Sequence, residues 1–183
     1  GPTGAGKSTT LYAVLAMLNM EGVNIVTLED PIEYFIYGVN QSQVRPEVGF
    51  TFASGLRALL RQDPNVIMVG EIRDGETAEL GIHAALTGHL ILTTIHTNDA
   101  LGIVPRLLDM KVEAFLLAAT FNLGIAQRLA RRVCQDCRTK VELPAGVVAQ
   151  MREELKKIPR RFLPADLNLE VLQFFKGAGC ARC

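Results

Sequence analysis

The sequence predicts an α/β domain with a mostly parallel β-sheet, followed by a small cysteine-bounded subdomain. Helical and strand-like patterns alternate along residues 1–133, which is typical of domains built from β–α units. The strand-like runs are short and mostly apolar, as expected for strands buried on both faces of a parallel sheet. This alternation stops after Arg132. We therefore expect a core over residues 1–133 and a separate subdomain over 134–183.

The expected elements follow from the spacing of apolar residues. Helices are predicted where apolar residues recur every three or four positions, and strands where they follow one another directly. In chain order we expect a helix over 8–20, a strand over 23–28, a helix from 52 that stops at Asp63-Pro64, a strand over 66–69, a helix over 77–86, a strand over 90–95, a helix over 100–110, a long helix over 113–132 and a short charged helix over 151–157. The long helix is basic at its end, which suits the helix dipole.

The composition is that of an ordinary globular protein and gives no support to a nucleic-acid-binding or membrane-spanning protein. Hydrophobic residues make up 49% of the 183, and 19 basic residues balance 19 acidic ones. This balance offers no electrostatic argument for a nucleic-acid or anionic-membrane partner. No apolar run approaches the ~20 residues that span a bilayer. The polar, glycine-rich residues 1–10 do not have the pattern of a signal peptide.

Residues 1–8 match the phosphate-binding pattern G-x-x-x-x-G-K-[ST] at every fixed position. Its glycines let backbone amides surround the β-phosphate, and the helix that follows adds its positive amino-terminal end. Lys7 is expected to reach the β- and γ-phosphates, and the Ser8 hydroxyl to bind Mg²⁺. The predicted nucleotide-binding residues are Gly1, Thr3, Gly4, Ala5, Gly6, Lys7, Ser8 and Thr9. A glycine-rich turn that matches by chance is the weaker alternative, because a helix and a buried strand follow where they should. Such a loop needs a strand before it, so we expect the complete protein to extend on the amino side of Gly1.

Glu71 is the candidate metal carboxylate. It follows the apolar run Val66–Val69, and a P-loop needs an acid at the end of a neighbouring buried strand. Gly70 holds the usual aspartate position, so Glu71 is expected to contact Mg²⁺ directly or through water. The alternative is that Glu71 only forms an ion pair with Arg73.

A second acidic group follows the strand over 23–28. Glu29 and Glu33 lie there around Asp30-Pro31, at the edge of the sheet where ligands bind in α/β proteins. Hydrolysis needs a group that orients the attacking water, and either glutamate could do this. A solvated acidic turn is the alternative on spacing alone.

Two histidines bracket the strand over 90–95. His96 falls at its carboxyl end, where a γ-phosphate sensor could stand, and His89 at the opposite end. A lone histidine at a strand end is more often structural, so the residues alone leave both roles open.

All four cysteines fall into two C-x-x-C pairs, Cys134/Cys137 and Cys180/Cys183. Two such pairs form a closed tetrahedral Cys₄ zinc site. Two disulfides are the alternative, and they are rare in the reducing compartments where ATP-using enzymes usually act. A thioredoxin-like redox role is weaker, because the pairs lack a suitable βαβ context. The segment between the pairs is too short to trust as an independent core.

Four motifs, in this order, resemble those of the secretion ATPases that power type II secretion and type IV pilus assembly. They are the Walker A loop 1–8 with its continuation 9–12, the aspartate box 27–34, the Walker B region 56–74 and the histidine box 84–99, and the stretch 126–129 is similar too. The resemblance covers nearly the whole chain. Ala5, where serine is common, and Asn65, where aspartate is common, are mild departures that remove no required donor or charge.

The resemblance implies a RecA-like fold and Mg²⁺-dependent hydrolysis of ATP. It implies that Glu33 is the catalytic carboxylate, that Glu71 serves the Mg²⁺ site, and that His89 and His96 are needed for activity. Gly70 is normal in this family. A tetracysteine zinc module is carried by the assembly and export ATPases and is generally absent from the retraction ATPases.

The resemblance also implies an assembly and a location. It implies a homo-hexameric ring, peripheral at the cytoplasmic face of a bacterial inner membrane. There it would act on an integral membrane platform protein to add pilin or pseudopilin subunits. In this family an upstream domain supplies arginines in trans to the nucleotide, so we expect the isolated 183 residues to hydrolyse ATP weakly or not at all.

Two alternatives remain from other functional classes. RecA-like cores also serve nucleic-acid translocases, but the neutral charge, the lack of a basic aromatic groove pattern and the cysteine module argue against this. A regulator that binds nucleotide without turnover is opposed by the intact set of Lys7, Ser8, Glu33 and Glu71. The sequence does not separate pilus assembly from type II secretion, because partners choose the cargo.

Overall fold

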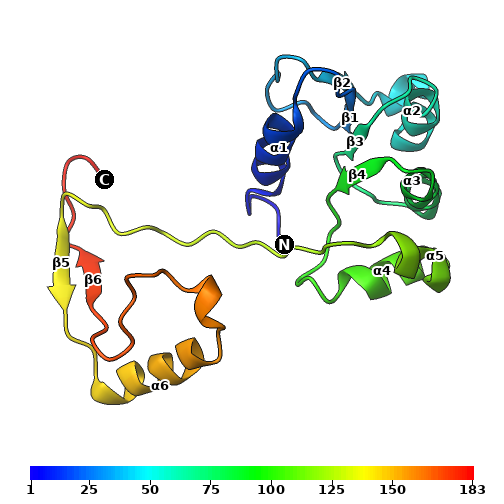
Figure 1. Ribbon diagram of the computed structural model, residues 1–183. Helices are drawn as coiled ribbons and strands as arrows, with labels where there is room; N and C mark the ends of the chain where they lie inside the picture. Colours follow the sequence, from blue (N-terminus) through cyan, green and yellow to red (C-terminus); the bar gives the residue numbers. More distant parts are fainter. The chain divides into compact units, whose positions relative to one another are not determined.

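The structure is a computed structural model that describes residues 1–183 and contains two compact units (Figure 1). The first unit is Gly1–Leu129 and the second is Ala130–Cys183. The chain divides a few residues before the expected position after residue 133.

A four-stranded sheet forms the centre of the first unit. Its strands are β1 (Ile25–Glu29), β2 (Asn40–Gln43), β3 (Val66–Val69) and β4 (Leu90–Thr93), in the order β2-β1-β3-β4. Every pair of neighbours is parallel, which confirms the predicted parallel sheet. All residues of β1 and β3 are buried, and this explains the apolar run of β3 and the mostly apolar sequence of β1. The polar edge strand β2 has no apolar pattern, so the sequence did not predict it.

Helices cover both faces of this sheet (Figure 1). They are α1 (Lys7–Leu18), α2 (Phe52–Leu59), α3 (Gly75–Leu86), α4 (Ile103–Asp109) and α5 (Ala114–Thr120), and a 3₁₀ turn, η1, spans Pro46–Val48. On one face, Tyr12 and Leu15 of α1 pack with Ile25 and Met68. The other four helices share a second core with the alternate residues of β1 and β3. Helices on both sides of a parallel sheet give the three-layer arrangement of an α/β domain.

The register of the sheet brings three strand ends to one edge. Leu28 pairs with Val69, and Val69 with Thr93. The residues that follow these strands, around Glu29, Gly70 and Thr94, therefore emerge side by side. This is the carboxyl edge at which α/β sheets bind ligands.

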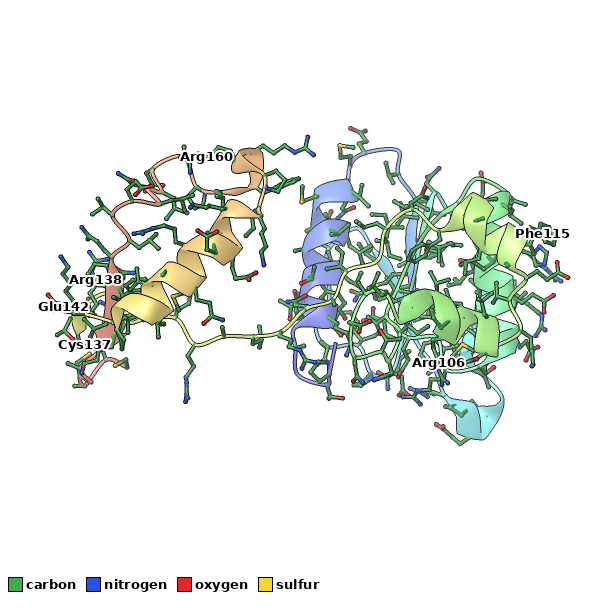
Figure 2. All side chains as sticks on the ribbon, turned by 90° about the horizontal axis from the view of Figure 1, so that it is seen from below. Arg106, Phe115, Cys137, Arg138, Glu142 and Arg160 are labelled. Atoms are coloured by element: carbon green, nitrogen blue, oxygen red, sulfur yellow. The ribbon has the colours of Figure 1, made fainter.

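The long helix predicted over 113–132 is wrong. Helix α5 ends at Thr120, Phe121 is extended, and residues 121–134 form no helix or strand. Gly124 packs so closely that a Cβ there would lie 2.9 Å from the Phe121 ring and 3.0 Å from Ile103. Glycine and asparagine are poor helix formers, so Asn122 and Gly124 end a pattern that apolar spacing alone would have continued. Phe115 of α5 projects away from the core and is 69% exposed (Figure 2).

The second unit is small and open. It contains the antiparallel pair β5 (Arg138–Val141) and β6 (Phe174–Gly177), helix α6 (Ala145–Lys156) and the 3₁₀ turn η2 (Arg160–Phe162). Helix α6 begins well before the predicted 151–157. No residue from 130 to 183 is buried. None of the helices in the structure has the length and apolar character needed to cross a membrane.

Candidate functional site

The phosphate-binding loop requires glycine at three positions for two different reasons. Gly4 and Gly6 have φ angles of 75° and 82°, in the left-handed region that other residues rarely adopt. A Cβ on Gly1 would lie 2.4 Å from the main-chain oxygen of Gln127. Helix α1 begins at Lys7, directly after Gly6, so the free amides of its first turn face the loop. Such amides make an anion-binding site.

Lys7 and Ser8 lie in a pocket of about 580 Å³ at the carboxyl edge of the sheet. The Lys7 ammonium donates to the main-chain oxygens of Gly1 and Pro2, both at 3.0 Å. These bonds hold its charge across the mouth of the loop. Besides loop residues, the pocket is lined by the acidic and histidine candidates Glu29, Asp30, Glu33, Glu71 and His96. This cavity combines a cation, a hydroxyl and several carboxylates. Such a set fits a nucleoside triphosphate with a divalent metal.

Gly70 is required by the close approach of β1. A Cβ at this position would lie 3.1 Å from the Leu28 oxygen and 3.4 Å from the Glu29 Cα, and the Gly70 amide already donates to that Leu28 oxygen at 2.7 Å. An aspartate here would require the main chain of β1 to shift. The first acid that β3 can present to the pocket is therefore Glu71.

The Glu71 side chain is 14% exposed and has two basic partners. Arg73 donates to its Oε1, and the Nε2 of His96 lies 2.9 Å from its Oε2. Burial alone would raise the pKa of the Glu71 carboxyl, but the bonds and charges of Arg73 and His96 outweigh burial and hold the pKa below its ordinary value. The Arg73 pair that the sequence left as an alternative is present, together with a second partner inside the pocket.

The two aspartate-box glutamates have opposite environments. Glu29 is 3% exposed and both of its carboxylate oxygens accept hydrogen bonds. Glu33 is exposed, and its side chain lines the pocket without a protein partner. The geometry therefore favours Glu33 over Glu29 as the carboxylate that can accept a hydrogen bond from the attacking water.

The two histidines lie at opposite ends of β4. His96 reaches Glu71 in the pocket, but His89 is not among the pocket residues. The Nδ1 of His89 lies 2.9 Å from the Ala84 oxygen and 3.0 Å from the Thr87 hydroxyl. His89 thus contacts the end of α3 and the turn into β4.

The four cysteines of the second unit form a cluster. Their sulfur atoms all lie within 4.8 Å of one another; the Sγ atoms of Cys180 and Cys183 are 3.6 Å apart, and those of Cys137 and Cys183 are 3.7 Å apart. A tetrahedral zinc with bonds of about 2.3 Å needs sulfurs separated by about 3.8 Å. The cluster therefore fits a zinc ion. Figure 2 shows Cys137 beside Arg138, at the start of β5.

The sequence patterns did not predict the side-chain contacts made by Glu29 and by the start of α1. Tyr12 of α1 and Gln41 of β2 both bond to Glu29, and the Thr10 hydroxyl donates to the Gln127 side chain at 2.8 Å. Helical spacing places Tyr12 on the apolar face, where it is counted as core. Gln41 lies in a strand with no apolar alternation. Apolar spacing marks neither residue as part of a site; the family resemblance includes Tyr12 only within the continuation 9–12 of the Walker A loop.

The comparisons with known proteins agree with this geometry. The family described as "Type II/IV secretion system protein" matches residues 1–183. The type II secretion system protein E of Klebsiella pneumoniae is 56% identical over 151 residues, which cover 82% of this chain and 30% of that protein. The type IV pilus assembly ATPase PilB of Acinetobacter baylyi is 49% identical over 183 residues, which are 100% of this chain and 30% of that protein.

A solved relative confirms the fold class. The crystal structure of the pilus retraction motor PilT with bound ADP aligns with a TM-score of 0.60 and 42% identity, over 66% of this chain and 38% of that one. The core is thus a RecA-like α/β unit with a parallel sheet, as predicted. This chain spans about a third of the length of the relatives it matches. On the family match over all its residues and the identity to these relatives, the chain belongs to the type II/IV secretion system protein family, that of the secretion and pilus ATPases.

Proposed function

We propose that this chain is the catalytic part of an ATPase that powers the assembly of pilin or pseudopilin subunits, in type IV pilus biogenesis or type II protein secretion. The observation that carries this proposal is the single pocket that contains Lys7, Ser8, Glu33, Glu71 and His96. These residues come from four separate segments of the chain, and the parallel sheet gathers them at one edge. The names of the relatives support the same activity.

Each pocket residue has a proposed part in hydrolysis. The loop amides and Lys7 hold the β- and γ-phosphates, and the Ser8 hydroxyl and Glu71 hold Mg²⁺. Bound Mg²⁺ would neutralise negative charge on these phosphates. Glu33 orients the attacking water and accepts its proton. His96 is kept beside the γ-phosphate by its bond to Glu71.

His89 is still predicted to be needed for activity, but through the structure of the sheet and not through contact with the nucleotide. Its ring contacts are with Ala84 and Thr87, at the end of β4 away from the pocket. We propose that His89 supports the turn from α3 into β4. Its loss would act on the placement of β4 and not on the nucleotide.

The second unit is proposed as a structural zinc module held by Cys134, Cys137, Cys180 and Cys183. The absence of buried residues from 130 to 183 supports this role, because such a unit has no core to stabilise it. By the family pattern, this module favours the assembly and export branch over retraction.

The assembly state and location rest on the family alone. We propose a homo-hexamer, cytoplasmic and peripheral at the inner membrane, that acts on an integral platform protein without direct nucleic-acid contact. The nucleotide in such a ring also needs residues from outside this chain. The isolated 183 residues are therefore expected to release phosphate slowly or not at all, whereas robust turnover would show that the core is sufficient.

The test is phosphate release by the full-length protein, with metal analysis. Glu71→Ala and Glu33→Gln are each expected to lower turnover by about 100-fold or more, and one zinc per chain is expected. Glu21→Gln changes an exposed glutamate outside the pocket and is the matched control. Unchanged turnover in both pocket variants would overturn the assignment of the acids, and absence of zinc would overturn the choice of the assembly branch.

A further inference from the structure

Glu29 is a buried acid that has no part in the hydrolysis proposed above. Its Oε2 accepts from the Tyr12 hydroxyl, and its Oε1 accepts from the Thr27 hydroxyl at 2.6 Å and from the Gln41 amide at 3.0 Å. Tyr12, Thr27 and Glu29 are each no more than 3% exposed. A buried polar group with all its partners is rigid, and losing one partner is costly. Three separate elements, α1, β1 and β2, thus meet at one carboxylate.

Two of these partners also hold the segment that carries Glu33. Residues 30–39 form no helix or strand. The Glu33 amide donates to the Tyr12 hydroxyl oxygen at 3.2 Å. The Gln41 side chain accepts from the Ile36 amide at 2.7 Å and donates to the Tyr34 oxygen at 3.2 Å. The irregular segment is therefore fixed at three points by Tyr12 and Gln41.

The chemistry of a phenol sets the direction of the bonds at Tyr12. A tyrosine hydroxyl has one proton to donate. Tyr12 donates it in the hydrogen bond to Glu29, so the lone pairs of its oxygen are free to accept from the Glu33 amide. Burial, followed by the hydrogen bond to Glu29, raises the pKa of Tyr12 to about 12. The phenol therefore stays protonated at neutral pH and keeps both bonds.

Tyr12 also connects this segment to the phosphate loop. It lies on the helix that begins with Lys7 and Ser8, one turn after Ser8, and residues four apart share a helix face. The Tyr12 and Tyr34 rings pack edge to face with centroids 4.6 Å apart. One rigid turn of α1 thus separates the phosphate-binding residues from the contact with Glu33.

We propose that Tyr12, anchored on Glu29 and assisted by Gln41, is a positioning residue that sets Glu33 relative to the phosphate loop. This inference rests on the proposed role of Glu33 as the group that orients water. Tyr12 acts only through the main chain of Glu33 and does not touch the reacting atoms. Its loss should slow the chemical step and leave nucleotide binding largely intact.

The first experiment uses the full-length protein and the variant Tyr12→Phe, which keeps the ring and removes the hydroxyl. We expect kcat to fall by about 10- to 100-fold, the size of effect that a misplacement near 1 Å produces. The Kd of a fluorescent ATP analogue should change by no more than about 2-fold, because Lys7 and the loop are untouched. Tyr37→Phe removes the hydroxyl of a tyrosine that is 98% exposed and should have wild-type kcat. An unchanged kcat in Tyr12→Phe would overturn the inference.

A double-mutant cycle separates positioning from a general structural role. Single-turnover hydrolysis with excess enzyme is measured for Tyr12→Phe, Glu33→Gln and the double variant. If Tyr12 acts through Glu33, Tyr12→Phe has little further effect once Glu33→Gln is present. Additive losses would overturn the inference and leave the role of Glu33 standing. Wild-type hydrolysis by Glu33→Gln would instead overturn the proposed role of Glu33, on which this inference rests. Should Tyr12→Phe fail to fold, Gln41→Met is the second variant. It removes the Gln41 bonds to Glu29, Tyr34 and Ile36 while Tyr12 stays in place, and it should show the same non-additive loss.

Discussion

The Nε2 of His96 lies 2.9 Å from the Oε2 of Glu71, and this contact joins the segment after β4 to the end of β3 at the carboxyl edge of the sheet. Arg73 holds the other oxygen of the same carboxylate and lies 3.7 Å from the Asp30 carboxylate. The side chains that follow three neighbouring strands are therefore linked in one network. Substituting any one of them should therefore alter nucleotide binding or hydrolysis.

His96→Ala should lower kcat of the full-length protein by about 100-fold, within the range found for groups placed beside a reacting centre. His96→Gln keeps an N–H donor for Glu71 and should retain part of the activity. Phosphate release checks both. His83→Ala is the control, since the His83 ring is exposed on α3 and its recorded partner is Glu79, 3.8 Å away. Equal loss in the His83 and His96 variants would contradict a specific role for the contact.

Gly70→Ala should destabilise the core by about 1 to 3 kcal/mol, the usual cost of overpacking. The added Cβ meets the Leu28 oxygen at 3.1 Å between two buried strands, which have little room to move. Gly81→Ala is the matched control: its nearest neighbour is the Ile91 Cγ2 at 4.0 Å, and in a helix the change should stabilise by about 0.5 to 1 kcal/mol. Chemical denaturation of the two variants should give opposite signs, and the same sign would contradict the packing argument.

Much of the fold could be predicted from the sequence, because buried parallel strands and amphipathic helices leave patterns in apolar residues. Strand β3 has the predicted bounds Val66–Val69, and α3 differs only at its start. Polar strand β2 and the end of α5 at Thr120 could not be predicted in this way. The first is held by pairing to β1, and the second by the packing of Gly124. The pairing of β2 involves a strand distant in the sequence, and the packing of Gly124 involves a residue without a side chain. Neither leaves a pattern in the spacing of apolar residues.

The candidate site was predictable where its residues belong to fixed motifs. Lys7, Ser8 and Glu71 lie in one pocket as their spacing indicated. The residues alone do not separate Glu29 from Glu33, because both are glutamates near the same strand end; only the family resemblance favoured Glu33. The structure separates them by burial, since Glu29 has its bonds filled by Tyr12, Thr27 and Gln41.

Cys180→Ser should remove most of the zinc from the protein and loosen the second unit. No buried residue stabilises the region from 130 to 183, so its fold should depend on the metal. Limited proteolysis should cut this region in Cys180→Ser and in chelator-treated wild type, while the first unit stays protected. Arg182→Ala breaks an exposed ion pair with Asp136, worth at most about 1 kcal/mol, and should keep its zinc. Full zinc content in Cys180→Ser would contradict a four-cysteine site.

Tyr12 should give the protein a pH-dependent stability at alkaline pH. Its pKa is raised from 10.0 to about 12, first by burial and then by the bond to Glu29. A group whose pKa is raised on folding contributes fully below its unfolded pKa, and that contribution is lost as pH rises through the folded value. The free energy of unfolding of wild type should therefore exceed that of Tyr12→Phe at neutral pH, and the difference should shrink between pH 10 and about 12. Chemical denaturation of both proteins across this range checks the sign, with Tyr37→Phe as the control for an exposed tyrosine. A difference that stayed constant, or grew, with rising pH would mean that the Tyr12 proton is not held by the folded state.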